Sequence, residues 1–385
     1  MKKKAKLKSR IAASLGALTV APSAAYLFFL IVFFSRFLQS RNLLKINSSN
    51  LTLIYLLILS MVLCSFGIVA GNAEAEKFFL RIGACIVGTI LVFLSTRRGD
   101  TATLRSFLLL VFIVAICNAL VVIITAIFPG SYDVLQIEKF SGFDKRVRAL
   151  RSPGLFRGYD TSGAFMSIAL AAIPISLSTT QRKNKYIVMP SVAILALACT
   201  LSSRTSMLVF IMTATLCLAL YKGSCQRYFR LTLLTALIPV ALFSFYLISV
   251  SFSSIPIFPA PQFVRDAVPQ NISLYYNDGV SDYLHHHILS DIRIFPIEIA
   301  FLPDNFYSRA GHALGAIGLF GALMPIAYMS AAMVTSNQGN TRRFCIILIA
   351  IFITVNFKNN YFFFLPFFTI LCFAYSTREV CAPRF

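Results

Sequence analysis

The stretch SFLLLVFIVAICNALVVIITAIF, residues 106–128, contains no charged residue and is followed by a Pro-Gly pair. A bilayer hydrocarbon core about 30 Å thick requires roughly 20 apolar residues in a helix. The stretch therefore predicts one transmembrane helix. Across the whole chain 58% of the residues are apolar and 13% are charged, whereas a soluble domain has about 45–50% apolar residues. We therefore expect an integral membrane protein.

Nine further stretches are apolar and carry few charges, and the last two of them are short and rich in Phe. No water is available in the bilayer core to satisfy free backbone groups, so each of these stretches is expected to be a helix. The nine stretches are residues 50–70, 78–96, 161–179, 186–202, 205–221, 231–250, 311–333, 344–357 and 360–376.

The N-terminal apolar run, residues 11–36, admits more than one interpretation. A cleaved signal peptide is one alternative, but the apolar character continues as far as Phe34. Pro22 divides the run at a position where a helix usually ends or kinks, so the run crosses the membrane once or returns as a short hairpin. The sequence thus predicts an all-α polytopic membrane protein. We expect a bundle of about 11–12 transmembrane helices that forms a single integral membrane domain, residues 1–385.

Charge predicts the orientation of the bundle, because short cytoplasmic loops collect Lys and Arg. One set of alternate connecting segments holds 22 of the 35 basic residues and two of the 14 acids. We expect this set, which includes both termini, to be cytoplasmic, and this favours the N-terminal hairpin and twelve crossings. The net charge of +21 then reflects topology and does not call for nucleic acid. The segments are 1–10, 36–49, 97–105, 180–187, 222–230, 334–343 and 377–385.

Two long loops, residues 129–160 and 251–310, fall on the periplasmic side in this topology. All nine cysteines lie elsewhere, so the loops hold no disulfide. The first loop is basic and suits an anion. The second has three arginines and six acids and suits a neutral or hydroxyl-bearing partner. Five of the cations in the first loop lie within 13 positions: Lys145, Arg146, Arg148, Arg151 and Arg157.

More cations are predicted on the same side at the membrane boundary. Arg81 lies near the outer end of its helix and Lys358 in the last outer turn, where their side chains are expected to reach the lipid headgroups. Arg204 lies in the tight turn SSRTS between two helices, which directs it to the mouth of the bundle. A guanidinium group binds phosphate oxygens through two parallel hydrogen bonds. The expected anion is therefore a polyprenyl diphosphate, a lipid that carries sugars for transfer.

Three segments occur in this order along the chain: GLFRGYDTSGAFMSIALAAI (154–173), LACTLSSRTSMLVFIM (197–212) and LPDNFYSRAGHALGAIGLFGAL (302–323). Together they resemble bacterial O-antigen and capsular polysaccharide repeat-unit polymerases and the related O-antigen ligases. The resemblance implies a multi-helix enzyme of the bacterial inner membrane, with cytoplasmic termini and a periplasmic active site. It implies an undecaprenyl-diphosphate-linked glycan donor and acceptor, and no metal, cofactor or nucleotide.

Within the resemblance, Arg204 matches the family arginine after the tight turn, and Arg151 matches the arginine before Gly-Leu-Phe. Ligases carry a His-Asn pair at the end of the large loop, where this chain has Asp304 and Asn305. The difference favours the polymerase. A family arginine early in the same loop is also replaced, and Arg293 is the candidate substitute. The glycines that follow are predicted to share a helix face and to allow close packing: Gly311, Gly315 and Gly318.

The expected reaction is glycosyl transfer from one lipid diphosphate to a hydroxyl of the next repeat unit. Arg151 and Arg204, helped by Arg148 or Arg157, would stabilise the departing diphosphate. Asp304 is the predicted catalytic base, although Pro-Asp-Asn is also ordinary turn sequence. Asp282 and Asp291 are the other candidate bases. Contacts with the glycan are expected from Arg293, Asn305, His287, Asp282 and Asp291.

Other interpretations remain open at this point. His287 and Asp291 are four residues apart and could share a metal ion, but a glycan-contacting or solvated loop is the favoured interpretation. A ligase and a lipid-linked oligosaccharide flippase are the alternative functions. The two halves of the chain show no matching pattern, and the helix interiors lack acidic pairs, which disfavours the transporter. The lipid bilayer and a chain-length regulator are further candidate partners.

Overall fold

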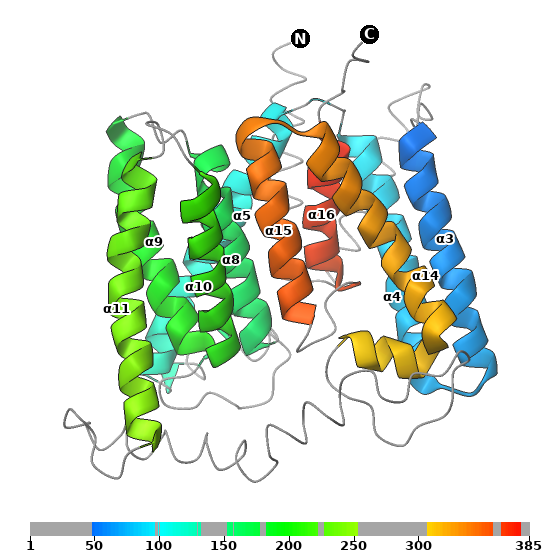
Figure 1. Cartoon of the computed structure of the whole chain (residues 1–385), viewed down its shortest axis with the longest axis horizontal. Helices are drawn as coiled ribbons and strands as arrows, with labels where there is room; N and C mark the ends of the chain where they lie inside the picture. The colour runs from blue at the N-terminus through cyan, green and yellow to red at the C-terminus, as the bar shows by residue number, and fades with distance from the viewer. Residues whose placement is uncertain are drawn as a thin grey trace. The chain divides into compact units, whose positions relative to one another are not determined.

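The computed structural model describes residues 48–96, 99, 101–128, 130–131, 152–156, 158–177, 182–221, 227–252, 306–356 and 363–378. Every long element in these residues is an α-helix, and each helix falls on one of the predicted stretches (Figure 1). The all-α class is thus confirmed, while residues 11–36 lie outside the described part. The helices are α3 (Ser48–Val69), α4 (Ala73–Ser95), α5 (Thr101–Ile127), α8 (Tyr159–Ser176), α9 (Arg182–Ser202), α10 (Arg204–Leu220), α11 (Arg227–Phe252), α14 (Phe306–Ser336), α15 (Gly339–Asn356) and α16 (Leu365–Ser376).

The lengths and surfaces of these helices fit a multi-pass membrane protein. Within the described residues, four helical spans are long and apolar enough to cross a bilayer: Ser48–Val69, Thr101–Ile127, Arg309–Ser336 and Gly339–Asn356. Shorter apolar helices cover Tyr186–Ser202, Thr205–Leu220 and Phe367–Ser376. Large apolar side chains are exposed on the helices, while hydroxyl and amide groups are buried between them, which is the arrangement that a lipid solvent favours. Examples are Phe66, Leu208, Ile238 and Phe320 outside, and Asn118, Ser162, Ser167 and Thr213 inside.

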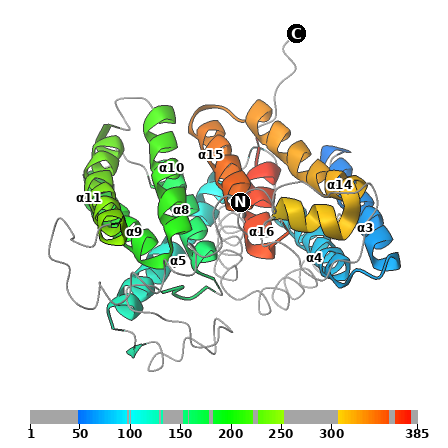
Figure 2. The same ribbon diagram turned by 60° about the horizontal axis from the view of Figure 1, so that its bottom comes forward.

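The chain forms two compact units, with the division inside α5 after Leu110. Unit 1 contains α3, α4, α14, α15, α16 and the first part of α5. In it α3 packs against α4 and α14, and α4 also packs against α16. Unit 2 contains the rest of α5 with α8, α9, α10 and α11. In unit 2, α8 packs against α9 and α10, and α11 packs against α9 (Figures 1 and 2).

Hydrogen bonds join the start of α3 to the end of α16 in unit 1. The Tyr375 hydroxyl donates to the Ser49 carbonyl at 2.7 Å, and the buried Arg378 guanidinium donates to Ser49 Oγ at 2.8 Å. The Gly99 N–H donates to the Arg378 carbonyl at 3.1 Å. We call this the Arg378 end. Three of the predicted cytoplasmic segments thus meet at one end, as their alternation requires, and the side of the membrane that this end faces stays a prediction.

Helix α14 is broken at Gly315, whose φ of 69° and ψ of 176° are not helical. The helix begins at Phe306 rather than at the predicted residue 311, and its first part, residues 306–314, runs in a different direction from the rest (Figure 2). The predicted common face of Gly311, Gly315 and Gly318 is therefore wrong, because the three glycines do not belong to one continuous helix. A Cβ on Gly318 would lie 2.5 Å from Leu314 Cβ, so the absence of a side chain at Gly318 allows the backbone to bend here without a clash.

Candidate functional site

The turn that carries Arg204 joins α9 to α10 through a single residue, Ser203. Ser203 has an extended backbone, and its Oγ accepts the Ser206 N–H at 3.0 Å, so it caps α10. The predicted tight turn is confirmed. Arg204 is the first residue of α10, where the helix dipole favours an anion. Its side chain lies outside the described part.

A network of hydroxyl groups fastens this turn to the start of α8. The Ser202 hydroxyl donates to the Tyr159 carbonyl at 2.7 Å, and the Ser206 hydroxyl donates to the same oxygen at 3.0 Å. The Ser203 hydroxyl donates to a carboxylate oxygen of Asp160. Gly163 allows this close approach, because a Cβ there would lie 2.0 Å from Ser206 Oγ. The turn before Arg204 is therefore held against α8 by short contacts.

The segment 152–156 docks against α5 and the same turn. The Ser152 N–H donates to the Leu201 carbonyl at 3.0 Å, and the Leu155 N–H donates to Asn118 Oδ1 at 2.8 Å. The amide of Asn118 donates in turn to Ser162 Oγ at 2.8 Å, and both side chains are buried. Gly154 has a φ of +63° and passes close to Asn118, where a Cβ would lie 2.5 Å from Oδ1. We call this end of unit 2, with the turn and the docked segment, the Ser203 end.

The docked segment lies between two of the predicted arginines in the sequence and contacts the turn that precedes a third. Arg151 immediately precedes Ser152, and Leu201, the hydrogen-bond partner of Ser152, lies three residues before Arg204. Arg157 immediately follows Phe156, whose buried ring lies against Phe165 with the ring centroids 4.8 Å apart. The described residues next to these arginines are thus fixed by hydrogen bonds and by packing.

The remaining predicted site residues cannot be placed together. Nine of them lie outside the described residues: Arg148, Arg151, Arg157, Asp282, His287, Asp291, Arg293, Asp304 and Asn305. Their grouping therefore stays a prediction. Helices extend into the predicted loops. In the first loop, 129–160, α8 begins at Tyr159. In the second loop, 251–310, α11 ends at Phe252 and α14 begins at Phe306.

Asp160 was not among the predicted site residues. It lies in the first turn of α8, half-buried, and accepts the Ser203 hydroxyl next to Arg204. The sequence prediction considered only carboxylates of the second loop as partners of the reaction. An acidic residue in the first turn of a helix, after a glycine and within a segment flanked by arginines, is the signal that could have pointed to it.

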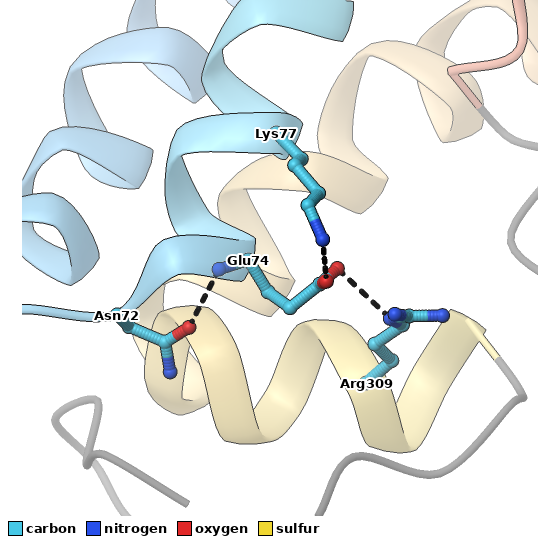
Figure 3. A network of polar contacts seen from close by, with 4 residues as sticks. All are labelled: Asn72, Glu74, Lys77 and Arg309. Carbon is cyan, nitrogen blue, oxygen red and sulfur yellow. Dashed lines mark hydrogen bonds and ion pairs between the residues drawn. The ribbon is translucent and has the colours of Figure 1, made fainter. Parts of the chain in front are cut away.

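Unit 1 has a charged cluster at the start of α4 and α14, which we call the Arg309 end. Asn72 caps α4 by accepting the Glu74 N–H at 3.0 Å. The Arg309 Nε donates to Glu74 Oε2 at 3.0 Å, and the Lys77 ammonium group contacts Oε1 of the same carboxylate (Figure 3). The side chains of Glu74, Arg309 and Lys77 are 11%, 29% and 59% exposed. One carboxylate thus joins two helices and two cations.

The ion pairs govern the protonation of Glu74. Burial raises its pKa, but the hydrogen bonds and positive charges of Lys77 and Arg309 together outweigh burial and hold the pKa below its ordinary value of 4.5. The carboxylate is therefore ionised at neutral pH. Sequence reasoning missed this cluster because its partners are 235 residues apart in the chain, although Asn72 followed by two acids is a typical helix start.

No group of three or more His, Cys, Asp and Glu side chains that could hold a metal ion occurs within the described residues. The expectation of a reaction without metal or cofactor stays a prediction. The chain matches no protein-family model, no curated protein and no solved structure. The resemblance to polymerases and ligases therefore stays a prediction from the three sequence segments and the general helix layout.

Proposed function

We propose that the chain is a membrane glycosyltransferase that polymerises undecaprenyl-diphosphate-linked oligosaccharide repeat units. The product is O-antigen or capsular polysaccharide, formed at the periplasmic face of the bacterial inner membrane. The observation that carries the proposal is the hydrogen bond from Ser152 to Leu201, at 3.0 Å. It joins the segment flanked by Arg151 and Arg157 to the turn from which α10 and Arg204 begin.

The chemistry of the donor explains why the docked segment and the turn before Arg204 need to be fixed to each other. A hydroxyl oxygen of the acceptor forms a bond to the anomeric carbon of the donor, and the bond from that carbon to the diphosphate oxygen breaks. The diphosphate takes the electron pair and becomes more negative as it leaves. Guanidinium groups fixed where this charge develops lower the barrier, because they need not reorganise during the reaction. Arg151 and Arg204, with Arg148 or Arg157, supply these groups in the proposal.

The proton of the attacking hydroxyl passes to a carboxylate. Asp304 is the proposed base, with Asp282 and Asp291 as the other candidates, and Arg293, Asn305 and His287 contact the glycan. A carboxylate within hydrogen-bond reach of the acceptor hydroxyl suffices for this transfer. Asp160 has another role in this proposal, since it accepts the Ser203 hydroxyl and so orients the turn before Arg204.

Deletion in a host that makes such a polysaccharide tests the proposal against its alternatives. Loss of a polymerase leaves lipid A core that carries a single repeat unit, and the wild-type chain restores the ladder of longer products. Loss of a ligase leaves polymer on its lipid carrier. Loss of a flippase leaves the repeat unit on the cytoplasmic side. Either of the last two outcomes contradicts the proposed polymerase.

A further inference from the structure

The charged cluster at the Arg309 end has an excess of positive charge on one face. Lys77 and Arg309 share a single carboxylate, Glu74. Arg81 follows Lys77 by four residues and continues the same face of α4. Glu76 lies two residues from Glu74 and therefore points about 200° around the helix from it. Among the residues that the structure describes, Lys77, Arg81 and Arg309 thus face a single carboxylate, Glu74, at this end of the unit.

The geometry of Arg309 leaves room for a second anion. Its Nε bonds to Glu74, which is the only partner of the guanidinium among the described residues. Figure 3 shows the far side of the guanidinium directed away from the carboxylate. The side chains of Arg309 and Lys77 are 29% and 59% exposed, so a ligand can reach both. The two terminal nitrogens of an arginine form the fork that binds phosphate oxygens.

The position of the cluster indicates the kind of ligand. Lys77 immediately precedes the predicted membrane span 78–96. Arg309 lies in the first part of α14, before the break at Gly315, where the chain changes direction (Figure 1). Both residues are therefore expected at the boundary between hydrocarbon and water. Phosphate groups of lipids occupy that level, and basic side chains near a membrane surface attract them.

We propose that Arg309 and Lys77 form a binding site for the phosphate or diphosphate group of a membrane lipid. Glu74 orients the two cations and competes with the ligand for them. Polymerisation joins two lipid-diphosphate-linked glycans, so it requires two places for a diphosphate, and Arg151 and Arg204 form one in the proposed function. The site at Arg309 would hold the second, that of the acceptor, and this assignment to the acceptor rests on the proposed function.

Binding to the purified full-length chain in detergent tests the site without any turnover. The probes are undecaprenyl diphosphate, phosphatidylglycerol and inorganic diphosphate. Each probe is titrated, and the number of bound probe molecules is counted by native mass spectrometry. The double variant R309Q/K77Q is expected to weaken one class of lipid site about tenfold or more, since it removes charge-assisted hydrogen bonds. E74Q is expected to tighten the same class about threefold, because the competing charge is gone. Arg342→Gln, an exposed arginine of α15, is the matched control and leaves binding unchanged.

The opposite signs of the two variants separate a ligand site from a simple clamp between α4 and α14. If E74Q and R309Q/K77Q both lower the melting temperature and neither alters lipid binding, the proposal is overturned. Tighter binding of undecaprenyl diphosphate than of phosphatidylglycerol supports a substrate, and equal binding supports a membrane headgroup. Binding of inorganic diphosphate alone excludes a lipid site. A wild-type chain that binds lipid but never polymerises would contradict the proposed function and leave the site intact.

Discussion

The Ser203 end of unit 2 and the Arg309 end of unit 1 are built from different chemistry. The first is held mostly by neutral groups that are largely buried, among them Ser152, Ser202, Ser206 and Asn118. The second is held by ion pairs of partly exposed side chains. Short neutral hydrogen bonds between close helices fix a backbone and respond little to pH, whereas exposed charges tolerate displacement and respond to pH and salt. The first end suits a group that must not move, and the second suits a ligand that exchanges.

Gly163→Ala should produce the largest effect, because Ser206 leaves no room for a Cβ on Gly163. The new Cβ would lie 2.0 Å from Ser206 Oγ and 2.7 Å from Ser206 Cα, so α8 and α10 must separate. We expect a loss of about 2–3 kcal/mol in stability, measured by thermal unfolding in detergent. Gly83→Ala is the control, since its Cβ would meet only Met61, at 3.9 Å. Equal melting temperatures for the two variants would show that the close contact does not exist.

Asn118→Ala should be the next most damaging change. It removes the acceptor of the Leu155 N–H and the donor to Ser162, both at 2.8 Å. The buried groups left without partners cost about 1–3 kcal/mol, and the amides of residues 152–156 should exchange hydrogen faster. Asn340→Ala is the control, because the Asn340 side chain accepts a hydrogen bond from Arg343, three residues later in the first turns of α15, and joins no second element among the described residues. Unchanged exchange in residues 152–156 would mean that Asn118 does not hold the docked segment.

Ser203→Ala tests the cap of α10 and its bond to Asp160. Loss of an N-cap hydroxyl costs about 1 kcal/mol, and the start of α10 should become less ordered while polymer length falls. Ser203→Thr keeps the hydroxyl and should restore both. Thr52→Ala serves as a control, since the exposed Thr52 hydroxyl only bonds back to its own helix at Ser48. A full-length product ladder in Ser203→Ala would argue against a positioning role for the turn.

The smallest effect concerns pH at the Arg309 end. The pKa of Glu74 is lower in the folded chain than its ordinary value of 4.5, so its ion pairs stabilise the fold above that pH. This stabilisation is lost as the pH falls through the folded pKa. At pH 7 the free energy of unfolding of the wild type should exceed that of Glu74→Gln by about 1 kcal/mol or less, seen as a higher melting temperature. This difference should vanish under acid conditions. If this difference in stability instead grows on acidification, the ion pairs of Glu74 do not stabilise the Arg309 end.

Much of the fold could be predicted from sequence, because a span of about 20 apolar residues has few alternatives in a membrane. The turn SSRTS was also predictable, since Ser203 caps a helix that begins with Arg204. The break at Gly315 was not, because the spacing of Gly311, Gly315 and Gly318 is the same for a continuous helix, and a glycine permits a positive φ without requiring one. The pairing of Glu74 with Arg309 across 235 residues depends on helix packing that no local pattern encodes.

The most direct test of the central claim is the length of the polymer made by Arg204→Lys. Lysine keeps the positive charge but lacks the planar fork, so two parallel hydrogen bonds to the diphosphate cannot form. At equal expression, and beside Arg342→Lys as the matched control, we predict that Arg204→Lys yields lipid A core with a single repeat unit while the control yields the full ladder. A normal ladder from Arg204→Lys would contradict binding of the lipid diphosphate by this guanidinium.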